Sequence, residues 1–231
     1  MEFIGENVKR VRARISAAAL RAGRNPDDIL LIAVTKNVGV NDVRKGIEAG
    51  LDMFGENRVQ EAEEKIVEVG HNVQWHMIGH LQTNKVKKAV DLFDIIHSVD
   101  SIHLAAEIEK RAFAVKKQVS VLLQVDLADE ETKFGFSKEE LFDALDKLAG
   151  FVHLRVRGLM TIPPFSPEPE DSRIYFKELA KIKEKISESR LSEIDMDILS
   201  MGMSQDFEVA IEEGANMVRI GTALFGPRCY K

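Results

Sequence analysis

The chain has 231 residues, of which 45% are hydrophobic and 30% are charged, a composition typical of a soluble globular protein. Its 32 basic and 38 acidic residues leave a net charge of −6, which lacks the basic excess of a general nucleic-acid-binding protein. The single cysteine, Cys229, excludes an internal disulfide and a cysteine-based metal cluster.

The apolar segments are too short to cross a membrane. The longest purely aliphatic run, Ile29–Val34, falls far below the roughly 20 residues that a spanning helix needs. The N-terminus lacks the basic start and apolar core of a signal peptide. We therefore expect a cytoplasmic protein that binds neither membrane nor nucleic acid.

The first 24 residues have the spacing of an amphipathic helix. Apolar residues recur every three or four positions, at Ile4, Val8, Val11, Ile15 and Ala19. Gly23 then provides a plausible end. Basic residues lie between the apolar positions; we interpret them as a solvated outer face, with a nucleic-acid or membrane surface as the alternative.

Strand and helix patterns alternate after this helix. Apolar segments predict strands at Ile29–Thr35, Met53–Gly55, Val73–Ile78, Ile95–Val99, Val119–Val125, Leu154–Ile162, Ile198–Met201 and Met217–Ile220. Amphipathic segments predict helices at Asp42–Ala49, Arg58–Val69, Asn84–Val90, Ile102–Lys116, Lys138–Leu148, Ser172–Glu188 and Gln205–Glu213. A short extra helix is expected after Gly221.

This alternation predicts a parallel sheet whose strands are buried on both faces. Eight strand–helix units favour a closed (β/α)₈ TIM barrel formed by a single domain over residues 1–231. An open doubly wound sheet is the alternative. The segment Thr35–Gly39 argues against it, because no Gly-x-Gly-x-x-Gly motif follows the first strand.

In a barrel of this kind, active sites lie where the strands end. Lys36 follows the first strand directly, where an apolar setting could favour Schiff-base chemistry at its amine. The alternative is a surface lysine at a strand exit. Ser200 and Gly202 after the seventh strand, with Gly221 and Thr222 after the eighth, resemble the phosphate site common in this fold. Glycines that only serve tight turns are the alternative.

Metal binding is not expected. His76 and His80 have a ligand-like spacing only on a helix. On a strand, side chains four residues apart lie about 13 Å from each other.

Motifs spread over residues 30 to 226 resemble the pyridoxal phosphate homeostasis protein family. They are Ala33–Lys36, Phe54–Glu61, Trp75–Lys85, Arg157–Met160, and Leu199–Asp206 together with Val218–Gly226. The resemblance implies a barrel like the N-terminal domain of alanine racemase, of the fold-type III kind, that carries pyridoxal 5′-phosphate (PLP).

The resemblance also implies roles for individual residues. Lys36 matches the lysine that holds PLP as a Schiff base, and Asn57 matches a residue near the cofactor ring. Ser200, Gly221 and Thr222 match phosphate ligands, and Arg219 matches the partner of the ring nitrogen.

An arginine at the ring nitrogen would keep that nitrogen unprotonated and weaken the electron sink that most PLP enzymes use. Related racemases take a second acid–base group from an additional C-terminal domain, which we expect to be missing because the chain ends at Lys231. Tyr230 is the only tyrosine near this end, and nothing in the sequence directs it to the site.

The favoured prediction is therefore a PLP carrier without a normal catalytic cycle. Such a carrier would be a monomer that supplies apo PLP-dependent enzymes. Two alternatives stay open: an amino-acid racemase of weak or narrow activity, and a Schiff-base aldolase or sugar-phosphate isomerase that uses no PLP.

Overall fold

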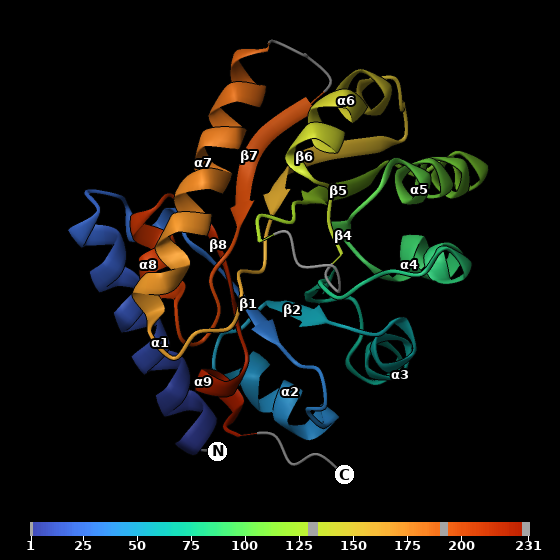
Figure 1. Cartoon of the computed structure of the whole chain (residues 1–231). Helices are drawn as coiled ribbons and strands as arrows, with labels where there is room; N and C mark the ends of the chain where they lie inside the picture. Colours follow the sequence, from blue (N-terminus) through green and yellow to red (C-terminus); the bar gives the residue numbers. More distant parts are fainter. Residues whose placement is uncertain (1, 129–133, 190–193, 228–231) are drawn as a thin grey trace.

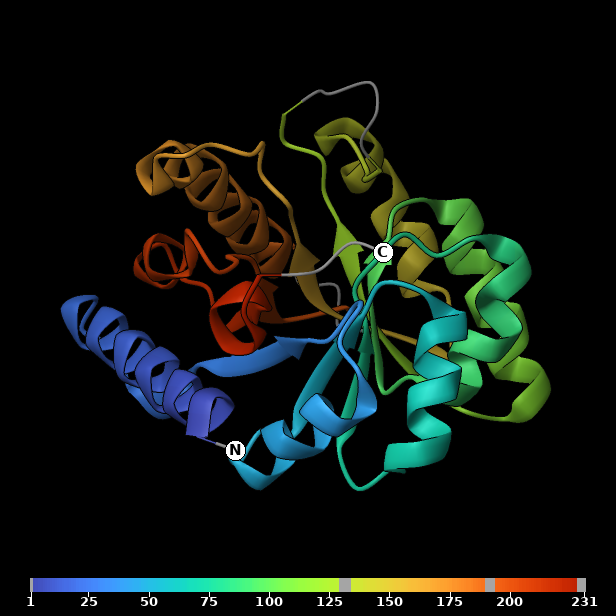
Figure 2. The same cartoon turned by 90° about the horizontal axis from the view of Figure 1, so that it is seen from below.

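The strands form a closed barrel surrounded by helices (Figure 1, Figure 2). The computed structural model describes residues 2–128, 134–189 and 194–227, so Cys229 and Tyr230 lie outside the described residues. Within these ranges, parallel strands β1 to β8 pair in chain order, and β1 pairs with both β2 and β8. The predicted (β/α)₈ barrel is confirmed.

The elements follow the predicted order. The strands are β1 (Leu30–Val34), β2 (Met53–Glu56), β3 (Gln74–Met77), β4 (Ile95–Val99), β5 (Val119–Gln124), β6 (Leu154–Met160), β7 (Ile194–Ser200) and β8 (Met217–Ile220). The helices are α1 (Glu2–Arg21), α2 (Val40–Glu48), α3 (Val59–Val69), α4 (Val86–Leu92), α5 (Ile102–Val115), α6 (Lys138–Ala149), α7 (Arg173–Glu188), α8 (Phe207–Glu212) and α9 (Thr222–Phe225). Short 3₁₀ turns are η1 (Pro26–Asp28), η2 (Thr83–Lys85) and η3 (Pro169–Ser172).

Two apolar cores hold the barrel together. The larger one lies between the strands and the surrounding helices. The smaller one is contributed by the neighbouring strands β5, β6, β7, β8 and β1: Leu122, Met160, Ile198, Met217 and Ile32. The barrel interior is therefore filled by side chains, as in other barrels of this size.

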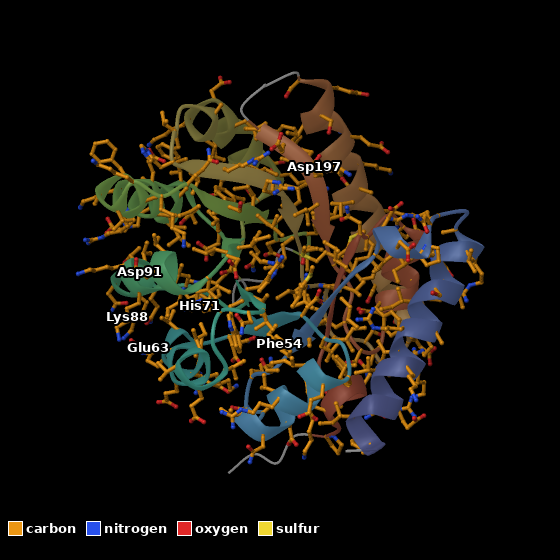
Figure 3. All side chains as sticks on the ribbon, turned by 180° about the vertical axis from the view of Figure 1, so that it is seen from behind. Phe54, Glu63, His71, Lys88, Asp91 and Asp197 are labelled. Atoms are coloured by element: carbon orange, nitrogen blue, oxygen red, sulfur yellow. The ribbon has the colours of Figure 1, made fainter. Side chains whose placement is uncertain are left out.

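Strand β7 is longer than predicted, because it begins at Ile194 rather than Ile198. Its first residues alternate between apolar and acidic side chains, a pattern of a strand with one solvated face. Asp195 lies 3.0 Å from Arg155 of β6, and Asp197, labelled in Figure 3, lies 3.6 Å from Arg157. A search for continuous apolar runs misses such a strand.

Gly158 allows β6 to approach β7 closely. Its φ of +150° is rarely adopted by residues with a side chain, and a Cβ atom there would lie 1.9 Å from the carbonyl oxygen of Ile198. The pairing registers of β6 with both neighbours shift beside this residue. A glycine is therefore required at this irregularity.

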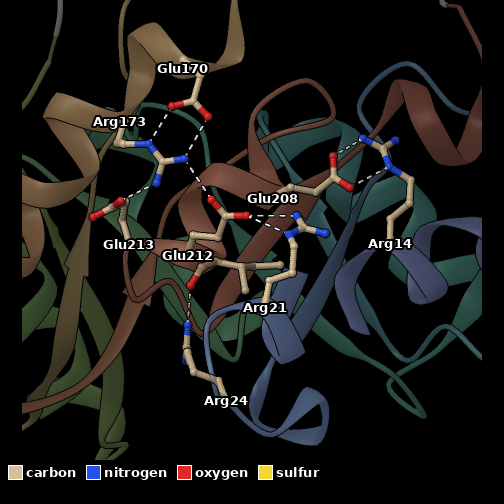
Figure 4. A network of polar contacts seen from close by, with 9 residues as sticks. Arg14, Arg21, Arg24, Glu170, Arg173, Glu208, Glu212 and Glu213 are labelled. Atoms are coloured by element: carbon tan, nitrogen blue, oxygen red, sulfur yellow. Dashed lines mark hydrogen bonds and ion pairs between the residues drawn. The ribbon is translucent and has the colours of Figure 1, made fainter. Parts of the chain in front are cut away.

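Helix α1 covers the outside of the barrel near α8 and α9. Its buried stripe includes Val8, Val11 and Ile15, and the Asn7 amide donates a hydrogen bond to the carbonyl of Leu224 at 2.8 Å. Basic residues of its other face contact carboxylates of α8 (Figure 4). Arg14 pairs with Glu208 at 2.7 Å. The predicted helix is confirmed, and part of its basic face forms ion pairs.

Among the described residues, no helix is long and apolar enough to cross a membrane. The same residues contain no group of three or more side chains suited to a metal ion.

Candidate functional site

A cavity of about 570 Å³ opens where the strands end. Its wall comes from segments far apart in the sequence: Val34 and Lys36 at the end of β1, Asn57 after β2, Ile78 after β3, residues 162–166 after β6, residues 203–206 after β7, and residues 219–223 from β8 into α9. Six strand ends thus bring side chains to one space, and five of them contribute polar groups, as this fold does in enzymes.

Five of the six predicted site residues line this cavity: Lys36, Asn57, Arg219, Gly221 and Thr222. Ser200 does not; it is fully buried, and its hydroxyl is engaged by Arg219 and His97. Ser204, four residues further along, lines the cavity. The roles assigned to these side chains stay predictions, whereas their convergence is a property of the structure.

The segment around Lys36 is held by backbone bonds. The Thr35 N–H donates to the carbonyl of Gly55 at 3.0 Å, and the Val38 N–H donates to the carbonyl of Thr35 at 2.9 Å. Asn37 has a φ of +60°, the left-handed conformation that asparagine tolerates better than most residues. Lys36 therefore leaves a tight turn at the end of β1, beside apolar Val34.

A buried ionic cluster contacts this turn, and none of the sequence motifs predicted it. We call it the Lys65 cluster; it consists of Lys65, Glu56 and Glu61. The Lys65 amine donates to Glu56 at 2.7 Å, to Glu61 at 2.6 Å and to the Thr35 carbonyl at 2.6 Å. Burial raises the pKa of Glu56, although Lys65 opposes that shift.

The signal for this cluster is present in the sequence. Helix α3 buries Val59, Ala62, Lys65 and Ile66, so Lys65 occupies a position of its apolar stripe. A lysine within such a stripe needs a buried partner. Glu61, four residues earlier, provides one on the same face of the helix.

Arg219 is a buried cation at the floor of the cavity, only 3% exposed. Its Nη1 donates to the carbonyl and hydroxyl of Ser200 at 2.6 and 2.7 Å, and its Nη2 donates to the carbonyl of Thr161 at 2.9 Å. Burial lowers the pKa of Arg219 to about 10, so it stays charged at neutral pH. Its hydrogen-bond partners are neutral, and Asp206 is the carboxylate that interacts with its charge, so the cation adds a positive potential at this end of the cavity.

Two buried histidines continue from Ser200 into the barrel. His97 Nδ1 lies 3.1 Å from Ser200 Oγ, and His97 Nε2 lies 2.9 Å from His76 Nδ1; the tautomers decide which atom donates. Burial lowers the pKa of His76 to about 4 and that of His97 well below 6.5. Both rings are therefore neutral at pH 7, and they support Arg219 through Ser200.

His80 does not belong to this chain of buried histidines. It borders a smaller cavity of about 210 Å³ that shares Asn57, Ile78 and Ile162 with the first. Its ring stacks on Phe134 with centroids 3.5 Å apart, and its Nδ1 lies 2.9 Å from Asp100. The two histidines singled out by their spacing, His76 and His80, thus have separate partners.

The loops that follow β7 and β8 brace each other beside the cavity. Gly202 has a φ of +91°, and a Cβ atom there would lie 2.6 Å from the Ala210 side chain. Asp206 accepts from the Met203 N–H at 2.6 Å and from the Ser172 hydroxyl at 3.1 Å. The Ser204 hydroxyl accepts from the Ala223 N–H at 3.3 Å, joining the two loops.

Comparison with known proteins identifies the family. The family model for the alanine racemase N-terminal domain matches residues 6–229. The chain is 44% identical to a pyridoxal phosphate homeostasis protein of Aquifex aeolicus, across 97% of this chain and 98% of that protein. It is 39% identical to the protein of that name from Escherichia coli K12, across 100% and 99%. The chain belongs to the pyridoxal phosphate homeostasis protein family.

Solved structures agree with this membership. PipY of Synechococcus elongatus PCC7942, a structure with PLP bound, matches with a TM-score of 0.87 and 34% identity over 96% of this chain and 100% of that one. An alanine racemase from Clostridium difficile 630 matches with a TM-score of 0.76 at 18% identity, over 100% of this chain and 57% of that one. The second likeness shows that this chain shares its barrel fold with that racemase.

Proposed function

We propose that this chain binds PLP reversibly in its barrel mouth and serves intracellular PLP homeostasis, with residues 1–231 acting as one PLP-binding unit. The observation that supports this proposal best is that Lys36 and the buried Arg219 line the same cavity. Membership of the family and the PLP-bound structure of PipY support the proposal.

The residues around the cavity fit the chemical groups of PLP. When bound, PLP supplies an aldehyde that condenses reversibly with a primary amine. Lys36 offers that amine next to apolar Val34 and Ile78, which can pack against a ring. Asn57 adds an amide on the same side of the cavity.

A phosphate group would lie against the loops that follow β7 and β8. Thr222 and Ser204 offer hydroxyls there, and Gly221 has no side chain to keep an anion from the backbone. Ser200, which the resemblance assigns to the phosphate, is buried beneath this space. In our proposal it orients Arg219, and Ser204 contributes the hydroxyl.

Arg219 determines what the bound cofactor can do. A guanidinium donates hydrogen bonds and does not release a proton at neutral pH. Placed at the ring nitrogen of PLP, it would keep that nitrogen unprotonated and so weaken the electron sink. The arrangement favours holding PLP over transamination.

An amino-acid racemase of weak or narrow activity is the second candidate. The observation in its favour is a lysine amine in a cavity of the racemase-type barrel. Racemisation requires a second acid–base group opposite the lysine. Asp206 is the carboxylate among the described lining residues, and its two oxygens accept bonds from Met203 and Ser172. Because both carboxylate oxygens already accept hydrogen bonds, Asp206 is poorly suited to be that second group, which favours the PLP carrier over the racemase.

We further propose that the carrier is a cytoplasmic monomer that supplies PLP to apo PLP-dependent enzymes. The cavity mouth includes Phe165, which is 83% exposed, so the cavity opens toward solvent and bound PLP can be handed on. Sedimentation of the pure protein tests the monomer. Reactivation of an apo PLP-dependent enzyme by the PLP-loaded protein tests the transfer.

The experiment that tests PLP binding is an absorption spectrum before and after borohydride reduction, with mass mapping of the adduct. The wild type should show the absorbance of a PLP–lysine adduct and a reduced adduct on Lys36. Lys36→Ala should lose both, whereas Lys45→Ala should keep them, because Lys45 pairs with Asp42 on α2. An unchanged spectrum in Lys36→Ala would refute the assignment. Amino-acid turnover that disappears in Lys36→Ala would favour the racemase.

A further inference from the structure

The Lys65 cluster lies beside the proposed cofactor site without lining it. None of its three residues belongs to the cavity wall that the described residues form. The side chains of Lys65 and Glu56 are 6% and 0% exposed, and that of Glu61 is 22% exposed. Charges so well buried are costly unless they are paired and hydrogen-bonded, which raises the question of what this cluster holds in place.

The Lys65 cluster forms hydrogen bonds with Thr35 and Asn37, the residues that flank Lys36 in the sequence. On one side, the Lys65 amine donates to the Thr35 carbonyl at 2.6 Å, and the Thr35 hydroxyl donates to Glu56 at 2.7 Å. On the other side, the Asn37 N–H donates to Glu61 at 2.6 Å. The backbone is therefore fixed both before and after Lys36.

The contact with Asn37 also supports an uncommon backbone conformation. Asn37 adopts a φ of +60°, which costs free energy in a residue other than glycine. A charge-assisted bond to the Glu61 carboxylate can offset that cost. Without it, the turn after Lys36 would relax toward ordinary conformations, and the lysine would point in other directions.

The cluster also reaches the end of β2, the neighbour of β1 in the barrel. Glu56 is the last residue of β2 and directly precedes Asn57, which lines the cavity. One buried network thus spans the ends of β1 and β2 and the inner face of α3. Both proposed cofactor contacts on this side depend on it for their backbone positions.

We propose that the Lys65 cluster positions Lys36. By fixing the backbone on both sides of this residue, the cluster directs the lysine amine into the cavity and thereby sets the affinity for PLP. Its residues act through the turn at residues 35–37 and do not touch the cofactor. The inference rests on the proposed function of Lys36 as the PLP-binding lysine.

Helix α3 offers a matched pair of variants. Glu61→Ala removes the carboxylate that holds Asn37. Glu63→Ala removes a carboxylate of the same helix that pairs with Lys88 at 2.6 Å on the surface (Figure 3). Glu61→Gln keeps an oxygen that can accept from Asn37. All three keep the buried Lys65–Glu56 pair, and Glu61→Ala removes one acceptor of the Lys65 amine, which keeps Glu56 and the Thr35 carbonyl.

Two measurements test the inference. Amide hydrogen exchange in the PLP-free protein follows the turn at residues 35–37, and absorbance titration gives the Kd for PLP. Glu61→Ala should exchange faster in that turn and bind PLP about tenfold more weakly, the order expected for one charge-assisted hydrogen bond. Glu63→Ala should match the wild type in both measurements, and Glu61→Gln should recover most of the affinity.

The outcomes separate this inference from the proposed function. A wild type without a borohydride-stable adduct would refute the function of Lys36, and the exchange measurement would still test the restraint on the turn. If the wild type forms the adduct and Glu61→Ala binds PLP as tightly as Glu63→Ala, the positioning role is wrong. Faster exchange with unchanged affinity would also overturn it.

Discussion

Arg219, Ser200, His97 and His76 form a continuous chain of buried polar contacts across strands β8, β7, β4 and β3. At one end is a cation that the protein keeps charged despite burial. At the other end, His76 Nε2 is buried without a hydrogen-bond partner among the described atoms. Since the two rings are neutral at pH 7, the chain can support Arg219 without adding a second charge beside it.

This chain makes stability depend on pH. Burial lowers the pKa of both histidines, so below pH 6.5 the unfolded state binds protons that the folded state does not. The free energy of unfolding should therefore fall as the pH drops from 6.5 toward 4, by up to about 2.7 kcal/mol per pH unit for two protons. Glu56 offsets part of this loss, because its raised pKa favours proton uptake by the folded state.

Urea unfolding at a series of pH values measures this slope. His76→Gln should reduce it by about 1.4 kcal/mol per pH unit, the contribution of one proton. His71→Gln, which changes an exposed histidine, is the control and should keep the wild-type slope. Equal slopes in His76→Gln and the wild type would contradict the burial argument.

Among the elements, α1, α7 and α8 are joined by an ionic network on the outer surface (Figure 4). Arg173 at the start of α7 contacts Glu170, Glu212 and Glu213, and Glu212 also receives Arg21 of α1. Five groups sharing one network stabilise more than an isolated exposed pair does. Hydrogen bonds to these carboxylates raise the pKa of Arg173.

We therefore expect Arg173→Ala to lower the free energy of unfolding by about 1–2 kcal/mol, because it leaves several carboxylates close together. The loss should shrink in 1 M salt, where exposed charges are screened. Arg155→Ala is the control, since it removes one exposed pair with Asp195, and it should cost about 0.5 kcal/mol or less. Equal losses in the two variants would show that the network adds nothing.

The elements also show what the sequence can and cannot predict. Periodicity located every strand, because parallel barrel strands are buried on both faces and read as apolar runs. It missed the start of β7, where Asp195 and Asp197 alternate with apolar residues. Those carboxylates belong to the strand because arginines of β6 pair with them, and such partners come from tertiary structure.

The same limit applies to the site. The ends of the strands and the family resemblance together indicated Lys36, Asn57, Arg219, Gly221 and Thr222, which converge on the cavity. Ser200 lies in the right loop but points inward, because Arg219 and His97 engage its hydroxyl. Lys65 lies in the apolar stripe of α3, which signals a buried partner, but only the folded chain places its amine against Thr35.

The whole molecule places its proposed ligand contacts on loops from both ends of the chain. Lys36 follows the first strand, whereas Arg219 and Thr222 belong to the last strand and the turn after it. The first and last strands, β1 and β8, pair with each other and close the barrel. A ligand that contacts both Lys36 and the residues of β8 therefore links these two strands. Binding should therefore stabilise the entire barrel rather than one loop.

PLP should raise the melting temperature of the protein in one cooperative transition. At a PLP concentration 100 times its Kd, mass action adds about 2.7 kcal/mol, which corresponds to about 5–10 °C for a domain of this size. Pyridoxal, which lacks the phosphate, should give a smaller shift, because it loses the contacts proposed for Thr222 and Ser204. Calorimetric scans with each compound measure these shifts. Two separate transitions, or equal shifts with PLP and pyridoxal, would contradict a single PLP-binding unit anchored at its phosphate.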